Sequence, residues 1–181
     1  MSEPYIHTTD QLINKWRTIF AKEKRPIIGI NWQGAKTNSA TLNVRSIPLE
    51  IFSKPIEKNE ITILSLQKGF GSEQRKHCSF NKKFIESQPQ IDSSLNFLKN
   101  AAIIENCDLI ITNDCSMAPF AGGMGKKVWL LLKDIPFWTW GLKGESTFWY
   151  PSMRLFRQKK RHNWKEVMER VSNAIKKEME D

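Results

Sequence analysis

Histidine and cysteine are scarce in this sequence, with three residues of each type among 181. The histidines lie far apart, and no two cysteines have the C-x-x-C spacing of zinc and redox sites. We therefore expect no metal site, no resident cofactor and no disulfide framework, and the reducing cytoplasm is the expected compartment. The residues concerned are His7, His77, His162, Cys78, Cys107 and Cys115.

Long apolar runs are also lacking. The longest have about six residues, whereas a helix that crosses a bilayer needs about 20. The first residues, MSEPYIHTTDQ, show no basic region followed by an apolar run. We therefore expect neither a transmembrane segment nor a secretory signal.

Several motifs of well-known enzyme classes are absent. There is no G-x-x-x-x-G-K-[S/T] run, no G-x-S-x-G elbow and no Asp-x-Asp pair. Residues 69–74, GFGSEQ, begin like the dinucleotide-binding fingerprint but have Gln74 in the last glycine place and follow the second predicted strand. These absences argue against P-loop nucleotidases, elbow-type serine hydrolases and Rossmann dinucleotide sites.

Positive charge, in contrast, is abundant. The chain has 28 Lys and Arg against 19 Asp and Glu, a net charge of +9. This excess favours an anionic partner, namely a nucleotide, a phosphorylated sugar, nucleic acid or an anionic membrane surface, although lysines that only serve solubility would give the same total. The length suits one domain with a core of its own and leaves no room for two full nucleotide-binding domains.

Four short runs are apolar at nearly every position, and helical segments separate them. Strands of this kind, buried on both faces, are typical of parallel βαβ units. The sequence therefore predicts an α/β fold with a single Rossmann-like domain, in which helices cover both faces of a parallel sheet. The predicted strands are 27–32, 61–66, 108–112 and 128–132.

The amino-terminal segment predicts an amphipathic helix over 8–24, because its apolar residues recur at spacings of three and four. Thr9 or Asp10 can cap this helix. We expect a helical arm over 1–25, followed by the Rossmann-like domain over 26–181.

The last helix has the clearest start. Asn163 is its predicted cap, and Glu166 follows three residues later as in a capping box. Between the fourth strand and this helix the sequence is rich in aromatic residues without a regular period. We therefore expect shorter helices over 49–55, over 95–105 and after Cys115, and an irregular stretch over 137–156.

Candidate binding residues follow the predicted strands, because ligands of open parallel sheets bind outside the carboxyl ends of the strands. The side chains there are small, polar or cationic, which suits a phosphorylated ligand. Lys68 is placed to face a diphosphate, although an ordinary exposed lysine would fit the same pattern. The candidates are Gln33, Gly34 and Lys36, then Gln67 and Lys68, then Asp114, Cys115 and Ser116, with Trp138 beyond the fourth strand.

The loop after the third predicted strand leads directly into a helix. Backbone N–H groups at a helix start attract phosphate, and Ser116 adds a hydroxyl donor. Asp114 would repel a phosphate, so its expected role is to cap the helix. The alternative to a phosphate site is therefore that residues 114–116 only cap the helix and bind no ligand. Cys115 either has a pKa lowered by the helix start or, as we expect, is a small buried side chain.

The segment 154–161 carries five cations and lies close to aromatic residues. Charge and stacking would allow it to bind single-stranded nucleic acid, or it is a solvated loop before the last helix. No nucleic-acid motif accompanies it, so nucleic acid is not an expected partner.

Four stretches, in order, resemble the carboxyl-terminal half of GT-B glycosyltransferases. They are IIGINWQG (27–34), RSIPLEIF (45–52), LSLQKGFGSEQ (64–74) and NDCSMAPFAGGMGKKVWLLL (113–132). The tail FWYPSMRLFRQ (148–158) is similar almost letter for letter to bacterial proteins that join tetratricopeptide repeats to a heptosyltransferase-like domain, and O-GlcNAc transferase is a more distant relative. The resemblance covers nearly the whole chain.

The resemblance implies a domain that binds a nucleotide sugar through its diphosphate, without an essential metal. Carried over by motif, Gln67, Lys68 and 114–116 would contact the diphosphate, Gly34 would let the first loop approach it, and Arg154 would face the cleft. The implied reaction is attack of an acceptor hydroxyl on the anomeric carbon. Lys68 and the helix start would stabilise the leaving diphosphate.

Two features depart from the family pattern. Cys115 stands where the heptosyltransferase-like pattern has Thr, and Pro119 stands where it has His, so one side-chain donor to a phosphate is missing. A GT-B active site also lies between two nucleotide-fold domains, and this chain has room for one. The expected partners are therefore a nucleotide sugar and either an amino-terminal GT-B half or a tetratricopeptide-repeat protein.

Three functions stay open at this point. The first is a glycosyltransferase donor half that works with a partner, which the resemblance favours. The second is a non-catalytic binding or assembly module with the same fold, for which Pro119 is the reason. The third is a nucleic-acid binder that uses 154–161. The base, the sugar, the acceptor and the oligomeric state cannot be read from the sequence.

Overall fold

The computed structural model describes residues 3–34, 45–94 and 96–180. At its centre lies a five-stranded sheet with the order β2-β1-β3-β4-β5, in which each neighbouring pair is parallel. The predicted α/β fold with a parallel sheet is confirmed. The strands are β1 (Ile27–Asn31), β2 (Thr62–Ser65), β3 (Leu109–Asn113), β4 (Val128–Leu132) and β5 (Met153–Arg157).

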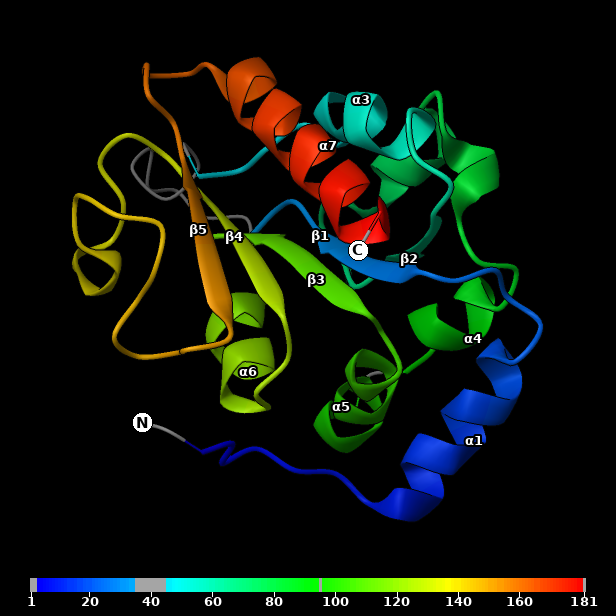
Figure 1. The fold of residues 1–181 in the computed structure, drawn as a ribbon. Coiled ribbons are helices and arrows are strands. Elements are labelled where there is room, and N and C mark those ends of the chain that lie inside the picture. Colours follow the sequence, from blue (N-terminus) through cyan, green and yellow to red (C-terminus); the bar gives the residue numbers. More distant parts are fainter. Residues whose placement is uncertain (1–2, 35–44, 95, 181) are drawn as a thin grey trace.

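Helices cover both faces of the sheet (Figure 1). One face carries α3 (Ser53–Glu57) and α7 (Trp164–Glu180), and the other carries α1 (Asp10–Phe20), α5 (Phe97–Glu105) and α6 (Met117–Gly123). Every residue of β1, β3 and β4 is buried, which explains why these strands are apolar at nearly all positions. The remaining elements are α4 (Gln88–Asp92) and the 3₁₀ turns η1 (Leu49–Phe52), η2 (Ser72–Lys76), η3 (Asn81–Lys83) and η4 (Trp138–Trp140).

The sheet separates two apolar clusters. The cluster under α3 and α7 contains Phe52 and Trp129, both about 1% exposed. The cluster on the other face contains Phe20 and Leu130, which are equally buried. The sheet therefore contributes side chains to two cores, one on each of its faces.

The first helix is shorter than predicted, because α1 begins at Asp10 and ends at Phe20. The Thr9 side chain accepts a hydrogen bond from the Leu12 N–H at 3.4 Å, as expected of a cap. Trp16 and Phe20 are buried in the same cluster as α5 and the sheet. The division into an arm and a domain stays a prediction.

The predicted start of the last helix is confirmed. Asn163 Oδ1 accepts the Glu166 N–H at 3.3 Å, which satisfies one free donor of the first turn of α7. The Glu166 carboxylate binds the Arg170 guanidinium, at 2.7 Å between Oε1 and Nε. The cap therefore forms from Asn163, while Glu166 serves an ion pair along the helix.

The prediction of an irregular stretch over 137–156 is wrong at its carboxyl end. Met153–Arg157 forms β5, which pairs with β4 from Val128↔Met153 to Leu132↔Arg157. Within this strand the buried Met153 and Leu155 alternate with the exposed Arg154. This alternation interrupts the apolar run that marks the interior strands.

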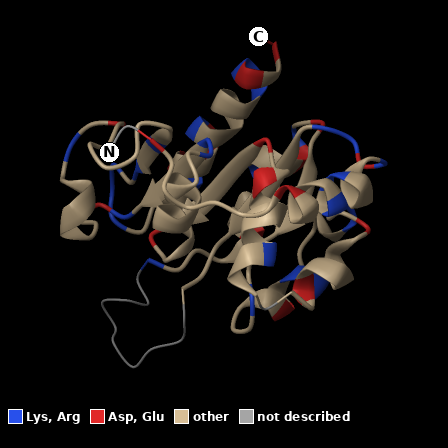
Figure 2. Cartoon of the chain, turned by 90° about the horizontal axis from the view of Figure 1, so that it is seen from below, with Lys and Arg blue, Asp and Glu red and all other residues tan. Residues whose placement is uncertain are grey.

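Lys, Arg, Asp and Glu occur throughout the described chain, as the coloured segments of the cartoon show (Figure 2). Many form exposed ion pairs, such as Lys22 with Glu86 and Arg25 with Asp108, which contribute little to stability. Among the described residues, no helix combines the length and the apolar composition that crossing a membrane requires.

Candidate functional site

The carboxyl ends of the central strands are joined by buried amides. Asn31, the last residue of β1, donates from Nδ2 to Asn113 Oδ1 at the end of β3, at 3.1 Å. Asn113 Nδ2 in turn donates to the Arg45 carbonyl at 3.1 Å. These bonds fix the segment that begins at Arg45 against the end of the sheet, where the sequence predicts a binding site.

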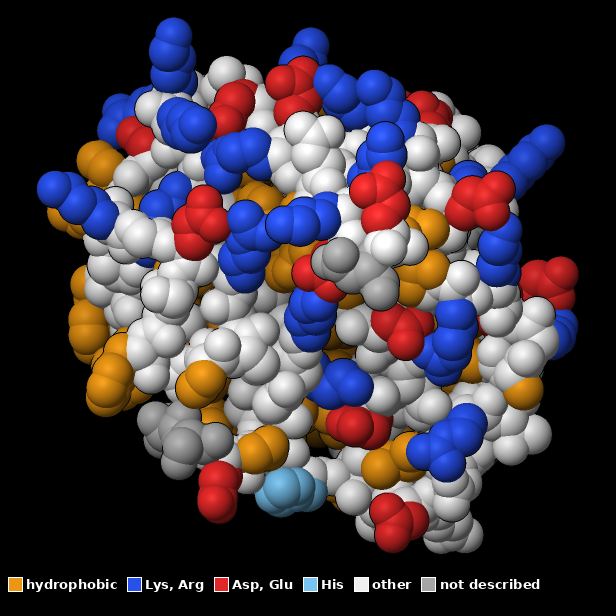
Figure 3. Space-filling view, viewed as in Figure 1, with side chains coloured by type: hydrophobic (Ala, Val, Ile, Leu, Met, Phe, Trp, Pro, Cys, Tyr) orange, Lys and Arg blue, Asp and Glu red, His pale blue; other side chains and the backbone are white. Residues whose placement is uncertain are grey.

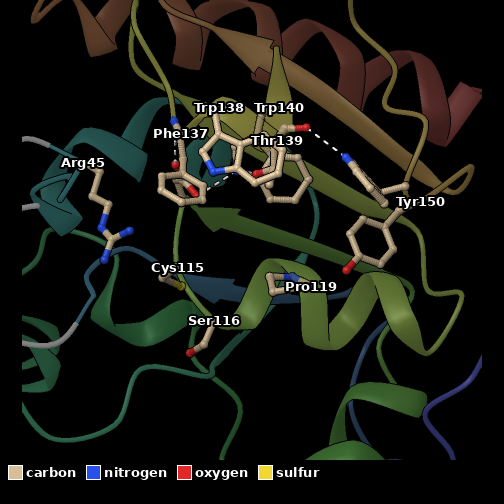
Figure 4. A pocket seen from close by; sticks show the side chains of 11 residues that line it. Arg45, Cys115, Ser116, Pro119, Phe137, Trp138, Thr139, Trp140 and Tyr150 are labelled. Atoms are coloured by element: carbon tan, nitrogen blue, oxygen red, sulfur yellow. Dashed lines mark hydrogen bonds between the residues drawn. The ribbon is translucent and has the colours of Figure 1, made fainter.

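A cavity of about 440 Å³ opens at this edge of the sheet. One wall is the loop after β3, and the facing wall is the aromatic loop after β4 (Figure 4). Arg45 and Tyr150 stand at opposite ends of the cavity (Figure 4). Its lining residues are Arg45, Asp114, Cys115, Ser116, Pro119, Phe137, Trp138, Thr139, Trp140, Trp149 and Tyr150.

Asp114 lines the cavity, but it does not cap the following helix. Its carboxylate accepts hydrogen bonds from Trp140 Nε1 at 2.8 Å and from the Phe137 N–H at 3.4 Å. The helix α6 begins after Ser116, and no side chain caps it. The prediction of a capping role is therefore wrong, because the carboxylate is used to hold the aromatic loop over the cavity.

Cys115 and Ser116 follow in the same wall. The Cys115 thiol accepts from Asn31 Nδ2 at 3.2 Å, and burial raises the pKa of the thiol. The sulfur is therefore neutral near pH 7, which argues against a nucleophile. The residue is half-buried in the cavity wall rather than fully buried as predicted. Ser116 is exposed and directly precedes α6, which begins at Met117.

Arg45 is a lining residue that the candidate set omits. Its side chain is half-buried, and Nε is buried without a hydrogen-bond partner among the described residues. A guanidinium that lacks a carboxylate partner can bind a phosphate or carboxylate with two parallel hydrogen bonds. The signal in the sequence is its place as the first residue of the RSIPLEIF stretch.

Tyr150 closes the other end of the cavity. Burial, together with a hydrogen bond to the Tyr5 hydroxyl at 3.2 Å, raises the pKa of Tyr150 to about 12. The phenol is therefore protonated at neutral pH. A Cβ at Gly122 would come within 2.8 Å of the Tyr150 ring, so the ring can pack on α6 only because residue 122 is glycine.

Gln67 and Gln33 lie beside the cavity, outside its lining. Gln67 Oε1 accepts the Gln33 N–H at 2.9 Å and the Trp32 N–H at 3.3 Å, and its Nε2 donates to the Phe70 carbonyl at 2.8 Å. Gln33 Oε1 accepts from Gln74 Nε2 at 2.9 Å. In this structure both glutamines join the loops after β1 and β2.

The first loop comes close to the cavity at Gly34. A Cβ there would lie 3.7 Å from Arg45 Nε and 3.9 Å from the Cys115 Cβ, which are ordinary contacts. Gly34 thus lies between two lining residues. Lys36 lies outside the described residues.

The Lys68 side chain does not line the cavity. Its ammonium donates to the Ile91 carbonyl at the end of α4, near Asp92. Burial lowers the pKa of Lys68, and the Asp92 carboxylate opposes this shift. The side chain is therefore engaged away from the cavity.

Of the two predicted cleft residues, Trp138 lines the cavity and Arg154 does not. Arg154 lies beside Trp129, near the amino ends of β4 and β5, and pairs with Glu145 at 2.9 Å. Its guanidinium also lies 4.7 Å from the centre of the Phe156 ring. Among the described residues, no group of three or more His, Cys, Asp or Glu could hold a metal ion.

Comparison with known proteins adds one finding. No protein-family model and no curated protein matches the sequence. A solved structure, the glycosyl transferase family 9 from Veillonella parvula DSM 2008, matches with a TM-score of 0.57 at 13% sequence identity. This is a glycosyltransferase fold. The match covers 96% of this chain and 46% of the other, so the chain spans less than half of that protein's length.

The expected likeness to a glycosyltransferase is thus confirmed for the fold. The relation to tetratricopeptide-linked transferases and to O-GlcNAc transferase stays a prediction. In chemical terms, the cavity combines a guanidinium whose Nε has no partner among the described residues with broad aromatic walls. Such a site suits a flat or apolar ring attached to an anionic group.

Proposed function

We propose that this chain is the donor-binding half of a glycosyltransferase. It binds a nucleotide sugar through its diphosphate, for transfer of the sugar to an acceptor hydroxyl, and a partner domain or chain completes the active site. The observation that carries the proposal is the cavity at the carboxyl ends of β3 and β4, where Arg45 faces aromatic walls. The glycosyltransferase fold and its coverage of 46% of the solved relative support it.

Arg45 is the residue that we assign to the diphosphate. It lines the cavity, and its Nε has no partner among the described residues. Lys68 would first have to leave the Ile91 carbonyl, and Asp114 is occupied by Trp140. In this proposal the guanidinium forms an ion pair with the diphosphate, the Ser116 hydroxyl donates a hydrogen bond to it, and an aromatic wall stacks the base or the sugar.

Calorimetry with UDP-, GDP- and ADP-sugars tests the proposal. We expect one of them to bind, and Arg45→Ala to weaken its affinity by roughly 10- to 100-fold, the range for a lost hydrogen bond to a charged group. Arg45→Lys should recover part of the affinity, since an ammonium is a point charge without the bidentate fork.

Two arginine variants serve as comparisons. Arg17→Ala changes an exposed arginine of α1 that binds Asn14, and it should leave the affinity unchanged. Arg154→Ala tests the cleft position implied by the resemblance, and we expect no effect there either, because Arg154 pairs with Glu145 outside the cavity. A folded protein that binds none of the nucleotide sugars would refute the proposal.

A second function has one observation in its favour. Pro119 lines the cavity where the resemblance implies a histidine, and it offers no donor to a phosphate. A non-catalytic binding module with this fold would therefore bind a nucleotide weakly and transfer no sugar, even with a partner half present. A transfer assay with an amino-terminal half or a tetratricopeptide-repeat protein, the partners we propose, separates the two functions. The cytoplasm stays the proposed compartment.

A further inference from the structure

The loop between β4 and β5 exposes several large apolar side chains. Phe148 is 83% exposed, Trp138 74% and Leu142 69%, and Ile135 and Phe137 are more than half exposed. We call these five residues the apolar loop face. In the space-filling view, hydrophobic side chains gather along the left edge of the molecule, over this loop (Figure 3).

The apolar loop face is large for a surface that stays in water. If a fully exposed large side chain contributes roughly 200 Å², the five side chains present on the order of 600 Å². That area lies at the upper end of what monomeric proteins leave uncovered. A patch of this size marks a surface that contacts something apolar.

The exposed conformation is built into the loop. The Arg157 guanidinium donates to the carbonyls of Trp140 at 2.6 Å, Gly141 at 2.9 Å and Gly144 at 2.8 Å. Both glycines have positive φ, 62° and 83°, and Leu142 lies in the turn between them. Since the backbone is held from the inside by Arg157, the side chains at the turn point outward.

Cations lie beside the apolar loop face. The Arg161 guanidinium bonds to Asp134 at 3.0 Å, which brings the turn before α7 to the base of the loop. Lys159 and Lys160, in the same turn, are exposed. The two acids of the loop, Asp134 and Glu145, are each paired with an arginine. Figure 3 shows Lys and Arg side chains above the hydrophobic edge.

We propose that the apolar loop face docks on an anionic lipid bilayer. Phe148 and Leu142 enter the interface between head groups and acyl chains, as the Phe and Leu side chains of membrane-surface segments do. Lys143, Lys159 and Lys160 face the anionic head groups. A short apolar insertion combined with a cationic cluster gives two weak signals that act together, which is how peripheral proteins attach stably.

An anionic bilayer fits this surface better than a protein partner does. The bilayer offers an apolar layer and a negative layer at fixed depth, and the chain presents an apolar turn with exposed lysines in the turn and beside it. Phe137 and Trp138 of this face also line the cavity, whereas Leu142 and Phe148 do not, so the docking surface is tested at residues outside the donor site. The two proposals can therefore fail separately.

Vesicle sedimentation tests the docking surface. We expect binding to phosphatidylcholine vesicles that contain phosphatidylglycerol and weak binding to phosphatidylcholine alone. Leu142→Ser with Phe148→Ser should lower the binding at least about tenfold, because most of the inserted apolar area is lost. Phe97→Ser is the matched control, since Phe97 is 74% exposed on α5 and should leave binding unchanged.

Lys159→Gln with Lys160→Gln tests the cations. This variant should bind the phosphatidylglycerol vesicles more weakly than the unaltered protein does. Its remaining affinity should also change less with salt concentration. Unchanged binding of either double variant, or no binding of the unaltered protein to anionic vesicles, would overturn the proposal. So would an unaltered protein that dimerises through this face and ignores vesicles, with Leu142→Ser and Phe148→Ser making it monomeric. Calorimetry with the nucleotide sugar should be the same for all of these variants.

Discussion

Gln67 shows how one buried side chain can hold two loops together. Only 4% exposed, it accepts two backbone N–H groups from the loop after β1 and donates to a carbonyl of its own loop. Removal of the amide would take this hydrogen bond from the N–H of the fully buried Trp32. The amide therefore satisfies backbone groups that no strand can pair at the end of the sheet.

Gln67→Met keeps the volume of the side chain and removes its amide. We expect the free energy of unfolding to fall by about 1–3 kcal/mol, the cost of leaving buried N–H groups unsatisfied. Urea denaturation followed by tryptophan fluorescence measures the change, and Gln11→Met on the exposed side of α1 is the control. Equal stability of the two variants would contradict the structural role of the amide.

For single residues, the sequence predicts where a side chain lies in the fold better than it predicts which group the side chain binds. Asp114, Cys115, Ser116 and Trp138 were expected at the carboxyl edge, and all four line the cavity. The partners depend on contacts between distant segments: Asp114 binds Trp140, 26 positions away, and Lys68 binds Ile91, 23 positions away. No local pattern records such a contact. Arg45 is not among the binding residues predicted from the sequence, because it does not directly follow a predicted strand.

At the scale of the element, α7 is fastened at its start by an ion pair as well as by its cap. The Arg170 guanidinium bonds to Glu166 and also donates to the Arg157 carbonyl at the end of β5. The same guanidinium lies 6.0 Å from the centre of the Phe156 ring. The pair therefore joins the last helix to the edge strand.

This pair predicts a dependence of stability on pH. Arg170 lowers the pKa of Glu166 below its ordinary value of 4.5, so folding favours the charged carboxylate. The stabilisation is complete above that value and is lost as the pH falls through the lowered pKa. Because both side chains are partly exposed, we expect at most about 1 kcal/mol.

Glu166→Gln should remove this contribution near pH 7 and flatten the loss of stability below about pH 4.5. Urea denaturation of both proteins at neutral and acidic pH measures the difference. Glu178→Gln, in an exposed pair with Lys127 near the other end of α7, is the comparison variant. An identical pH profile for Glu166→Gln and the unaltered protein would count against the pair.

Strands that are apolar at nearly every position could be predicted from the sequence more reliably than β5, which carries two arginines. The runs that form β1, β3 and β4 are apolar because neighbours cover them, and β2, although it lies at one edge of the sheet, is buried from Ile63 to Ser65. That apolar pattern is visible without a structure. The edge strand β5 places Arg154 and Arg157 among apolar residues, so the pattern alone suggests a loop. Its strand character comes from pairing with β4, a contact that the local sequence does not encode.

At the scale of the whole molecule, the sheet makes the two apolar clusters interdependent. Side chains of neighbouring strand residues enter opposite clusters, as Leu130 and Leu131 of β4 do. Loss of either cluster would expose one face of every strand. We therefore expect the described domain to unfold as one unit.

Two conservative variants test this unity. Phe20→Leu acts in one cluster and Phe52→Leu in the other, and each should lower the free energy of unfolding by about 1–2 kcal/mol. Each should shift one transition, which has the same midpoint by tryptophan fluorescence and by far-ultraviolet circular dichroism. Phe97→Leu, at an exposed position, should shift neither signal. Separate midpoints for the two variants would show that the faces unfold independently.

The grip of Arg157 on the β4–β5 loop has a consequence for how this loop can vary. The guanidinium recognises only carbonyl oxygens, which every residue type carries, so the path of the turn is encoded by one arginine and two glycines. The side chains between them are free to differ without changing the scaffold. The turn is therefore a natural graft site, where related sequences or a designer can exchange the recognition surface and leave the fold intact.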